Sequence, residues 1–179
     1  MTRSLALPAD ALVLLVGPSG SGKTTFAARH FAPSQVLSSD ALRETIADDP
    51  TDQRATDDAF TLLHEILAMR LRRGRLTVVD ATNLEAWARA QLLDGAWRLR
   101  RPTVAIVLDV GLEVCLERNA TRQPRPVPPA AIRRQHRWLR DSLASLPGEG
   151  FADVHHLASA AEVDAVRLER GASRREPGG

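Results

Sequence analysis

Residues 17–24 read Gly-Pro-Ser-Gly-Ser-Gly-Lys-Thr and fit the pattern G-x-x-x-x-G-K-[ST] at every fixed position. The continuous apolar run at 11–16 predicts a buried strand before this stretch, and residues 23–31 predict a helix after it. A glycine-rich turn can match such a pattern by accident, but this strand and this helix are the context that a phosphate-binding loop requires. We therefore expect a P-loop, in which converging backbone N–H groups and the start of a helix hold phosphate oxygens.

The side chains of this loop predict which part of a nucleotide each one contacts. Lys23 is expected to reach the β- and γ-phosphates, and the Thr24 hydroxyl is expected to ligate Mg²⁺. Lys23 is also the only lysine among 24 cationic residues, and a compact ammonium fits between phosphate oxygens where a planar guanidinium substitutes poorly. The predicted nucleotide-binding residues are Gly17, Ser19, Gly20, Ser21, Gly22, Lys23, Thr24 and Thr25.

The rest of the composition is that of one globular domain. The 179 residues are enough to bury a core without disulfides, and the single cysteine, Cys115, excludes an intrachain disulfide and a cysteine-based metal cluster. No apolar run is long enough to cross a membrane, and the N-terminal residues lack the apolar segment of an export signal. We expect a cytoplasmic protein with no membrane partner.

Strands and helices are predicted to alternate along the chain. The strands are expected at 11–16, 36–39, 76–79, 104–108 and 154–157, and the helices at 23–31, 41–47, 55–73, 83–99, 112–119, 130–146 and 160–170. This alternation predicts an α/β fold of the P-loop NTPase and kinase type, a parallel five-stranded sheet flanked by helices. One domain, 1–170, and a disordered tail, 171–179, complete the expected organisation.

Polar side chains follow two of the predicted strands, where a parallel sheet opens onto its ligand crevice. Asp40 can accept a proton from an attacking hydroxyl or can cap the next helix, and the two roles can coexist. Arg43, one turn further along the same helix face, can hold an anionic group of the acceptor. Asp80 can orient Mg²⁺ through water or can cap a helix starting at Asn83, and Asn83 is itself expected to contact the substrate.

Three arginines lead into a cluster of prolines. Arg118, Arg122 and Arg125 lie between two predicted helices, at a spacing that suits a lid closing over the phosphates. A solvated arginine-rich loop is the alternative interpretation. We expect these three arginines to form the catalytic set together with Lys23 and Asp40.

Several stretches besides the P-loop follow the pattern of one known family. They are Ser38-Ser39-Asp40-x-x-Arg43, Asp57–His64, Thr77–Asn83, Cys115-x-Glu117-Arg118-Asn119 and Gly150-Phe151. With them the chain resembles, over nearly its whole length, the 5′-hydroxyl polynucleotide kinases. It is most similar to the kinase domain of the bacterial kinase–phosphatase–ligase-like RNA end-repair protein.

The resemblance implies a reaction and a set of roles. The γ-phosphoryl group of ATP, or of another NTP, would pass to the 5′-OH end of single-stranded RNA or DNA with Mg²⁺, in nucleic acid repair. Asp40 would be the general base, and Arg43 would contact the phosphate next to the terminal nucleoside. Since the family protein continues into phosphatase and ligase-like domains, we expect either a free-standing kinase or one domain of a longer repair polypeptide, monomeric when alone.

Two other functions remain open from the sequence. A small-metabolite kinase, such as one acting on a sugar acid or an antibiotic, shares the P-loop, the strand-end aspartate and the lid. Arg43 separates the two, because a phosphodiester needs a cation there and a neutral polyol needs hydrogen-bonding groups. A non-catalytic nucleotide-binding module is the third hypothesis, although such a module needs neither Asp40 nor the lid arginines.

Overall fold

The structure is a computed structural model that describes residues 4–123 and 126–171. Its centre is a five-stranded parallel sheet with the strand order β3-β4-β2-β5-β6. These strands are β2 Leu12–Val16, β3 Val36–Ser38, β4 Thr77–Asp80, β5 Thr103–Leu108 and β6 Asp153–Leu157. The predicted α/β fold with a parallel five-stranded sheet is therefore confirmed.

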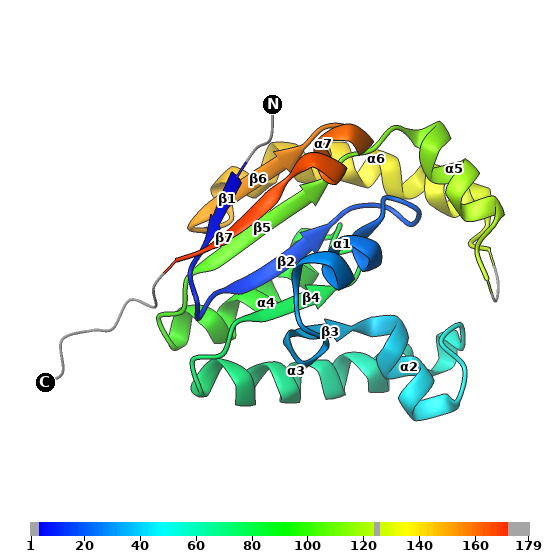
Figure 1. Ribbon diagram of the computed structural model, residues 1–179. Helices are drawn as coiled ribbons and strands as arrows, with labels where there is room; N and C mark the ends of the chain where they lie inside the picture. Colours follow the sequence, from blue (N-terminus) through cyan, green and yellow to red (C-terminus); the bar gives the residue numbers. More distant parts are fainter. Residues whose placement is uncertain (1–3, 124–125, 172–179) are drawn as a thin grey trace, which may run out of the picture.

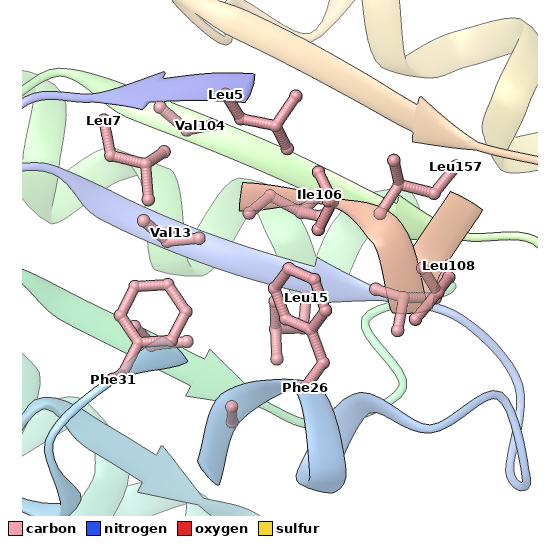
Figure 2. Packing of buried hydrophobic residues seen from close by; sticks show 14 of the residues in the cluster. Leu5, Leu7, Val13, Leu15, Phe26, Phe31, Val104, Ile106, Leu108 and Leu157 are labelled. Atoms are coloured by element: carbon pink, nitrogen blue, oxygen red, sulfur yellow. The ribbon is translucent and has the colours of Figure 1, made fainter. Parts of the chain in front are cut away.

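The three central strands are buried along their whole length because secondary structure covers both faces of the sheet. Alternate side chains of each strand point to opposite faces, so each strand contributes to two cores. Val13 and Leu15 pack in one core with Phe26, as Figure 2 shows, whereas Leu12 and Leu14 belong to the other. A run of apolar residues without alternation is the sequence pattern that this double burial requires.

Helices cover the sheet on both sides (Figure 1). One core receives side chains from α1, α5 and α7, the other receives them from α3 and α4, and α6 contributes to both. No helix among the described residues is long and apolar enough to cross a membrane. The helices are α1 Lys23–His30, α2 Ser39–Ala47, α3 Thr56–Arg72, α4 Ala86–Arg98, α5 Leu112–Ala120, α6 Pro129–Ser145 and α7 Ala160–Ala165, with short 3₁₀ turns η1 Pro33–Gln35, η2 Gln53–Ala55 and η3 Leu146–Gly148.

A second, two-stranded sheet lies over the α1 face and corrects two predictions. It pairs β1 Ser4–Leu7 with β7 Arg167–Arg170 in parallel. The helix predicted over 160–170 is wrong beyond Ala165, because its last residues form β7. The strand β1 was not predicted at all, although Leu5 and Leu7 alternate with exposed residues and are buried in the core.

The carboxyl ends of three neighbouring strands meet at one edge of the sheet. In register, Ser38 of β3 lies opposite Asp80 of β4, and Asp80 lies opposite Leu15 of β2. The P-loop follows β2 and α2 follows β3, so the P-loop, the start of α2 and Asp80 share this edge (Figure 1). The sheet thus brings together residues separated by about sixty positions in the sequence, as its parallel order requires.

Candidate active site

The P-loop follows β2 and ends in the first turn of α1. Gly20 and Gly22 have φ angles of +84° and +96°, which only glycine adopts without strain. A Cβ at Gly20 would also collide with the main-chain carbonyl of Cys115 in α5, so the loop backbone lies directly against that helix. Glycine is therefore required at both positions for the loop to take this shape.

Lys23 is buried beneath this loop. Its Nζ donates to the carbonyl oxygens of Gly17 and Pro18, each at 2.8 Å, and lies 3.5 Å from the Ser21 hydroxyl. Burial lowers the pKa of Lys23 from 10.5 to about 8, although the negative charge of Asp80 opposes the shift. The ammonium is therefore the main form at neutral pH, held inside the loop that a phosphate would enter.

Thr24 and Asp80, the two residues predicted to hold Mg²⁺, are in direct contact. The Thr24 hydroxyl donates to Asp80 Oδ2 at 2.8 Å. Burial raises the pKa of Asp80, and the Thr24 hydrogen bond and the Lys23 charge oppose that shift. One hydroxyl and one carboxylate beside a phosphate loop are the oxygen donors that Mg²⁺ takes in such sites, so the residues present fit the ion. The alternative capping role of Asp80 is wrong, because α4 begins at Ala86.

Asp40 lies between two arginines from different parts of the chain. Its Oδ1 accepts a hydrogen bond from Nη2 of Arg43, and its Oδ2 accepts one from Nη2 of Arg122 at 2.8 Å. The residue that caps α2 is Ser38, whose hydroxyl accepts from the Ala41 N–H. The capping alternative for Asp40 is therefore wrong, and its carboxylate, 42% exposed, is directed to the arginines instead.

This second cluster belongs to the same site as the P-loop. Asp40 lies two residues after Ser38, which is opposite Asp80 in register, and the charges of Asp40 and Arg122 contribute to the pKa shifts of Lys23 and Asp80. Arg43 is largely buried, and its Nε donates to the Pro50 carbonyl at 3.0 Å. The structure thus places a carboxylate, two guanidinium groups and the P-loop ammonium around one edge of the sheet.

The remaining lid arginines are placed in part. Arg118 is exposed on α5, and its Nη1 lies 3.5 Å from the P-loop carbonyl of Ser21. A hollow of about 230 Å³ lies beside this contact, and its lining includes Gly22, Thr25, Arg118 and Asp164. Arg125 lies outside the described residues. Two of the three arginines therefore reach the site, and lid closure stays a prediction.

Asn83 has internal partners that the sequence did not suggest. Its side-chain amide, almost fully buried, donates to the Leu15 carbonyl at 2.7 Å, and its φ is +49°. It thus ties the residues after β4 to the end of β2. The substrate contact predicted for Asn83 stays a prediction.

Arg89 is a structural residue that sequence reasoning missed. It is fully buried and donates to both carboxylate oxygens of Glu149, to the Asn83 carbonyl and to the Ser142 hydroxyl. Through these bonds it links the segment after β4 to α6. The sequence pattern that could have identified it is an arginine on the inward side of an apolar helix.

Gln135 is a second residue that was missed, and it contacts the P-loop. It lies on α6, and its Oε1 accepts a hydrogen bond from the Ser19 N–H at 2.8 Å. Its position between Ile132 and Leu139, on the buried stripe of the helix, was the signal that could have found it.

Comparisons with known proteins agree with this fold. Residues 12–143 match the family described as AAA domain, whereas a comparison with curated protein sequences gives no match. A gluconokinase from Sinorhizobium meliloti 1021 aligns with a TM-score of 0.55 and 19% identity, over 88% of this chain and 87% of that one. A chain of the Pnkp1/Rnl/Hen1 complex aligns with a TM-score of 0.53 and 21% identity, over 64% of this chain and 40% of that one. A chain of the PezAT toxin–antitoxin system of Streptococcus pneumoniae aligns with a TM-score of 0.65 and 14% identity, over 92% of this chain and 71% of that one. At these identities the likeness concerns the fold.

Proposed function

This chain belongs to the AAA domain family, and we propose that it transfers the γ-phosphoryl group of ATP, or of another NTP, to the 5′-hydroxyl end of RNA or DNA. The observation that carries the proposal is the carboxylate of Asp40, held between Arg43 and Arg122 at the edge of the sheet that carries the P-loop. A protein that only binds a nucleotide needs no such carboxylate. We place the reaction in cytoplasmic nucleic acid end repair.

In this reaction Asp40 accepts the proton of the 5′-hydroxyl as its oxygen attacks the γ-phosphorus. The bond from the γ-phosphorus to the bridging oxygen breaks, and that oxygen leaves with the nucleoside diphosphate. Lys23, Arg118 and Arg122 neutralise the charge on the transferred group, and Arg125 would join them from the predicted lid. Mg²⁺, held by Thr24 and through water by Asp80, would supply further charge stabilisation at the donor phosphates.

The acceptor side depends on Arg43. Its Nε is bonded to Pro50 and its Nη2 to Asp40, while its Nη1 has no hydrogen bond within the described part of the chain. We assign that nitrogen to the phosphate next to the terminal nucleoside. The hollow beside Arg118 and Thr25 lies next to the P-loop and suits the nucleoside of the donor.

A small-metabolite kinase is the second candidate function, and one observation favours it. The side chain of Arg43 is only 11% exposed, and two of its nitrogens are already bonded within the protein. A short acceptor with hydroxyl groups could bind there without a phosphodiester. The gluconokinase similarity, which spans most of both chains, is compatible with this candidate.

An acceptor competition separates the two candidates. The protein, Mg²⁺ and γ-labelled ATP are mixed with equal concentrations of a 5′-OH RNA oligonucleotide, its DNA counterpart, gluconate and a neutral polyol. Label on an oligonucleotide, and none on a matched 5′-phosphorylated control, is the expected result. Label on a small molecule alone would replace the proposal by the second candidate, and label on no acceptor would remove both.

A further inference from the structure

The contact between α6 and the P-loop places an unexpected polar group at the phosphate site. Gln135 lies one helical turn from both Ile132 and Leu139, which are buried, so its side chain shares their inward direction. Instead of entering the apolar core, its carboxamide reaches the Ser19 N–H at 2.8 Å. This is a hydrogen bond across 116 positions of sequence, so the fold itself brings it about.

The direction of this hydrogen bond fixes the orientation of the carboxamide. A backbone N–H can only donate, so the oxygen of Gln135 faces Ser19, and the amide nitrogen with its two N–H donors is the other terminal atom. Ser19 belongs to the loop whose N–H groups are expected to hold phosphate oxygens. The nitrogen of Gln135 is therefore a hydrogen-bond donor on a side chain that is bonded to the P-loop itself.

We propose that Gln135 is a γ-phosphate-binding residue: its amide donates to a γ-phosphoryl oxygen of the bound nucleoside triphosphate. The inference rests on the proposed function for the identity of the donor nucleotide. It extends the site from the P-loop and the arginines to α6. Because a diphosphate has no γ-phosphoryl group, the contact discriminates the triphosphate from the diphosphate product.

The surroundings of α6 hold Gln135 in position. Leu139, one turn further, is almost completely buried, and Ser142 bonds to both Arg89 and the Leu84 carbonyl. Before the helix, the side chain of Asn119 makes two hydrogen bonds with the main chain of Val127, at 2.7 and 2.9 Å. A carboxamide on a helix fixed at both ends loses little freedom when it binds a phosphate.

The test compares ATP and ADP affinities of the full chain by titration calorimetry in the presence of Mg²⁺. Gln135→Leu should weaken ATP binding about tenfold and leave ADP binding nearly unchanged, as expected for the loss of one hydrogen bond to a charged group. Gln135→Glu should weaken ATP binding further, because a carboxylate still accepts from Ser19 but repels the γ-phosphate. Gln91→Leu makes the same substitution on the exposed side of α4 and should change neither affinity.

The outcomes distinguish this inference from the function on which it rests. Equal losses for ATP and ADP would make Gln135 a support of the P-loop and would overturn the proposal, and so would unchanged or improved ATP affinity. Thermal unfolding of each variant shows whether the fold is intact. No acceptor is present, so a protein that phosphorylates no oligonucleotide can still confirm the role of Gln135. Conversely, the parent protein could transfer phosphate to an oligonucleotide while Gln135→Leu weakens ATP and ADP binding equally. That result would support the proposed function and contradict the role of Gln135.

Discussion

Two clusters of arginine and carboxylate in this molecule differ in burial and in what surrounds them. In one, Arg89 is fully buried and bonds both oxygens of Glu149, at 2.6 and 2.5 Å. In the other, Asp40 is 42% exposed and accepts from Arg43 and Arg122. Both clusters consist of arginine and carboxylate groups. Only their surroundings can therefore show which cluster stabilises the fold and which is available for a reaction.

The difference lies in which hydrogen-bonding positions are used. Each nitrogen of Arg89 donates within the protein, and the Ser145 hydroxyl adds a further bond to Glu149, so this cluster can only hold elements together. Asp40 instead takes its partners from α2 and from the segment after α5, and its side chain is 42% exposed. The carboxylate of Glu149 is only 16% exposed and both of its oxygens are bonded to Arg89. The more exposed carboxylate of Asp40 can exchange an arginine for a substrate hydroxyl more readily.

The largest expected effect comes from removing the charge of the exposed cluster. Asp40→Asn should lower phosphoryl transfer to a 5′-OH oligonucleotide about 1,000-fold, because the amide cannot accept the proton. Its ATP affinity and its unfolding free energy should stay close to those of the parent protein. Single-turnover transfer of the labelled γ-phosphoryl group measures the rate.

The matched control for this change is Asp94→Asn. Asp94 also pairs with an arginine, Arg98, but on the exposed surface of α4. It should transfer at the parent rate. If Asp40→Asn lost ATP affinity as strongly as it lost transfer, the exposed cluster would be structural like the buried one. The two clusters would then not differ in role.

The second effect concerns stability and the buried cluster. Glu149→Gln should lower the free energy of unfolding by about 3 kcal/mol, because it leaves the Arg89 charge buried without its partner. Burial raises the pKa of Glu149, but the hydrogen bonds from Arg89 and Ser145 and the Arg89 charge outweigh it, so the pKa is lowered. The stabilisation is thus present above the ordinary pKa of glutamate and is lost as the pH falls through the lowered value.

Urea unfolding at several pH values measures this effect. Glu65→Gln, on the exposed side of α3, is the control and should change the unfolding free energy by less than about 0.5 kcal/mol. If both variants lost a similar free energy of unfolding, the Arg89–Glu149 ion pair would stabilise the fold no more than an exposed carboxylate does.

Much of the fold could be predicted because its strongest sequence patterns are local. The apolar runs of β2, β4 and β5 are buried on both faces, and the glycines of the P-loop mark a turn between a strand and a helix. The pairing of β1 with β7 was missed because it has no such local pattern. Residues 167–170 are mostly exposed and carry only one apolar side chain, so their strand depends on a partner at the other end of the chain.

The site was predictable where one motif holds the residue and not where a distant contact decides its role. The Thr24–Asp80 contact follows from the P-loop and the parallel strand order. In contrast, Asn83 resembled a substrate ligand by position, and only the structure shows its bond to the Leu15 carbonyl. The sequence pattern of Gln135 and Arg89 indicates only that each lies on the inward side of its helix, because their partners are 116 and 60 positions away in the sequence.

Lys23 provides a third prediction, because it is buried like Arg89 yet belongs to the site. Its pKa is lowered to about 8 by burial, so the free protein loses this proton as the pH rises above 8. If ATP binds the ammonium form, its affinity should fall about tenfold between pH 7 and pH 9. Lys23→Met should bind ATP weakly and show no such dependence. An ATP affinity of the parent protein that is constant up to pH 9 would contradict this role of Lys23.

The smallest expected effect is the change in unfolding free energy when Arg122 is replaced. Like Glu149→Gln, this substitution removes one partner of an ion pair, but the pair lies at the surface. Arg122 is 39% exposed and its partner Asp40 is 42% exposed, so water already screens and replaces much of their attraction. Arg122→Gln should therefore change the free energy of unfolding by less than about 0.5 kcal/mol in urea, against about 3 kcal/mol for Glu149→Gln. A loss near that of Glu149→Gln would mean that Arg122 holds the fold together. Asp40 would then be one partner in a structural ion pair, and its assignment as the base would lose its main support.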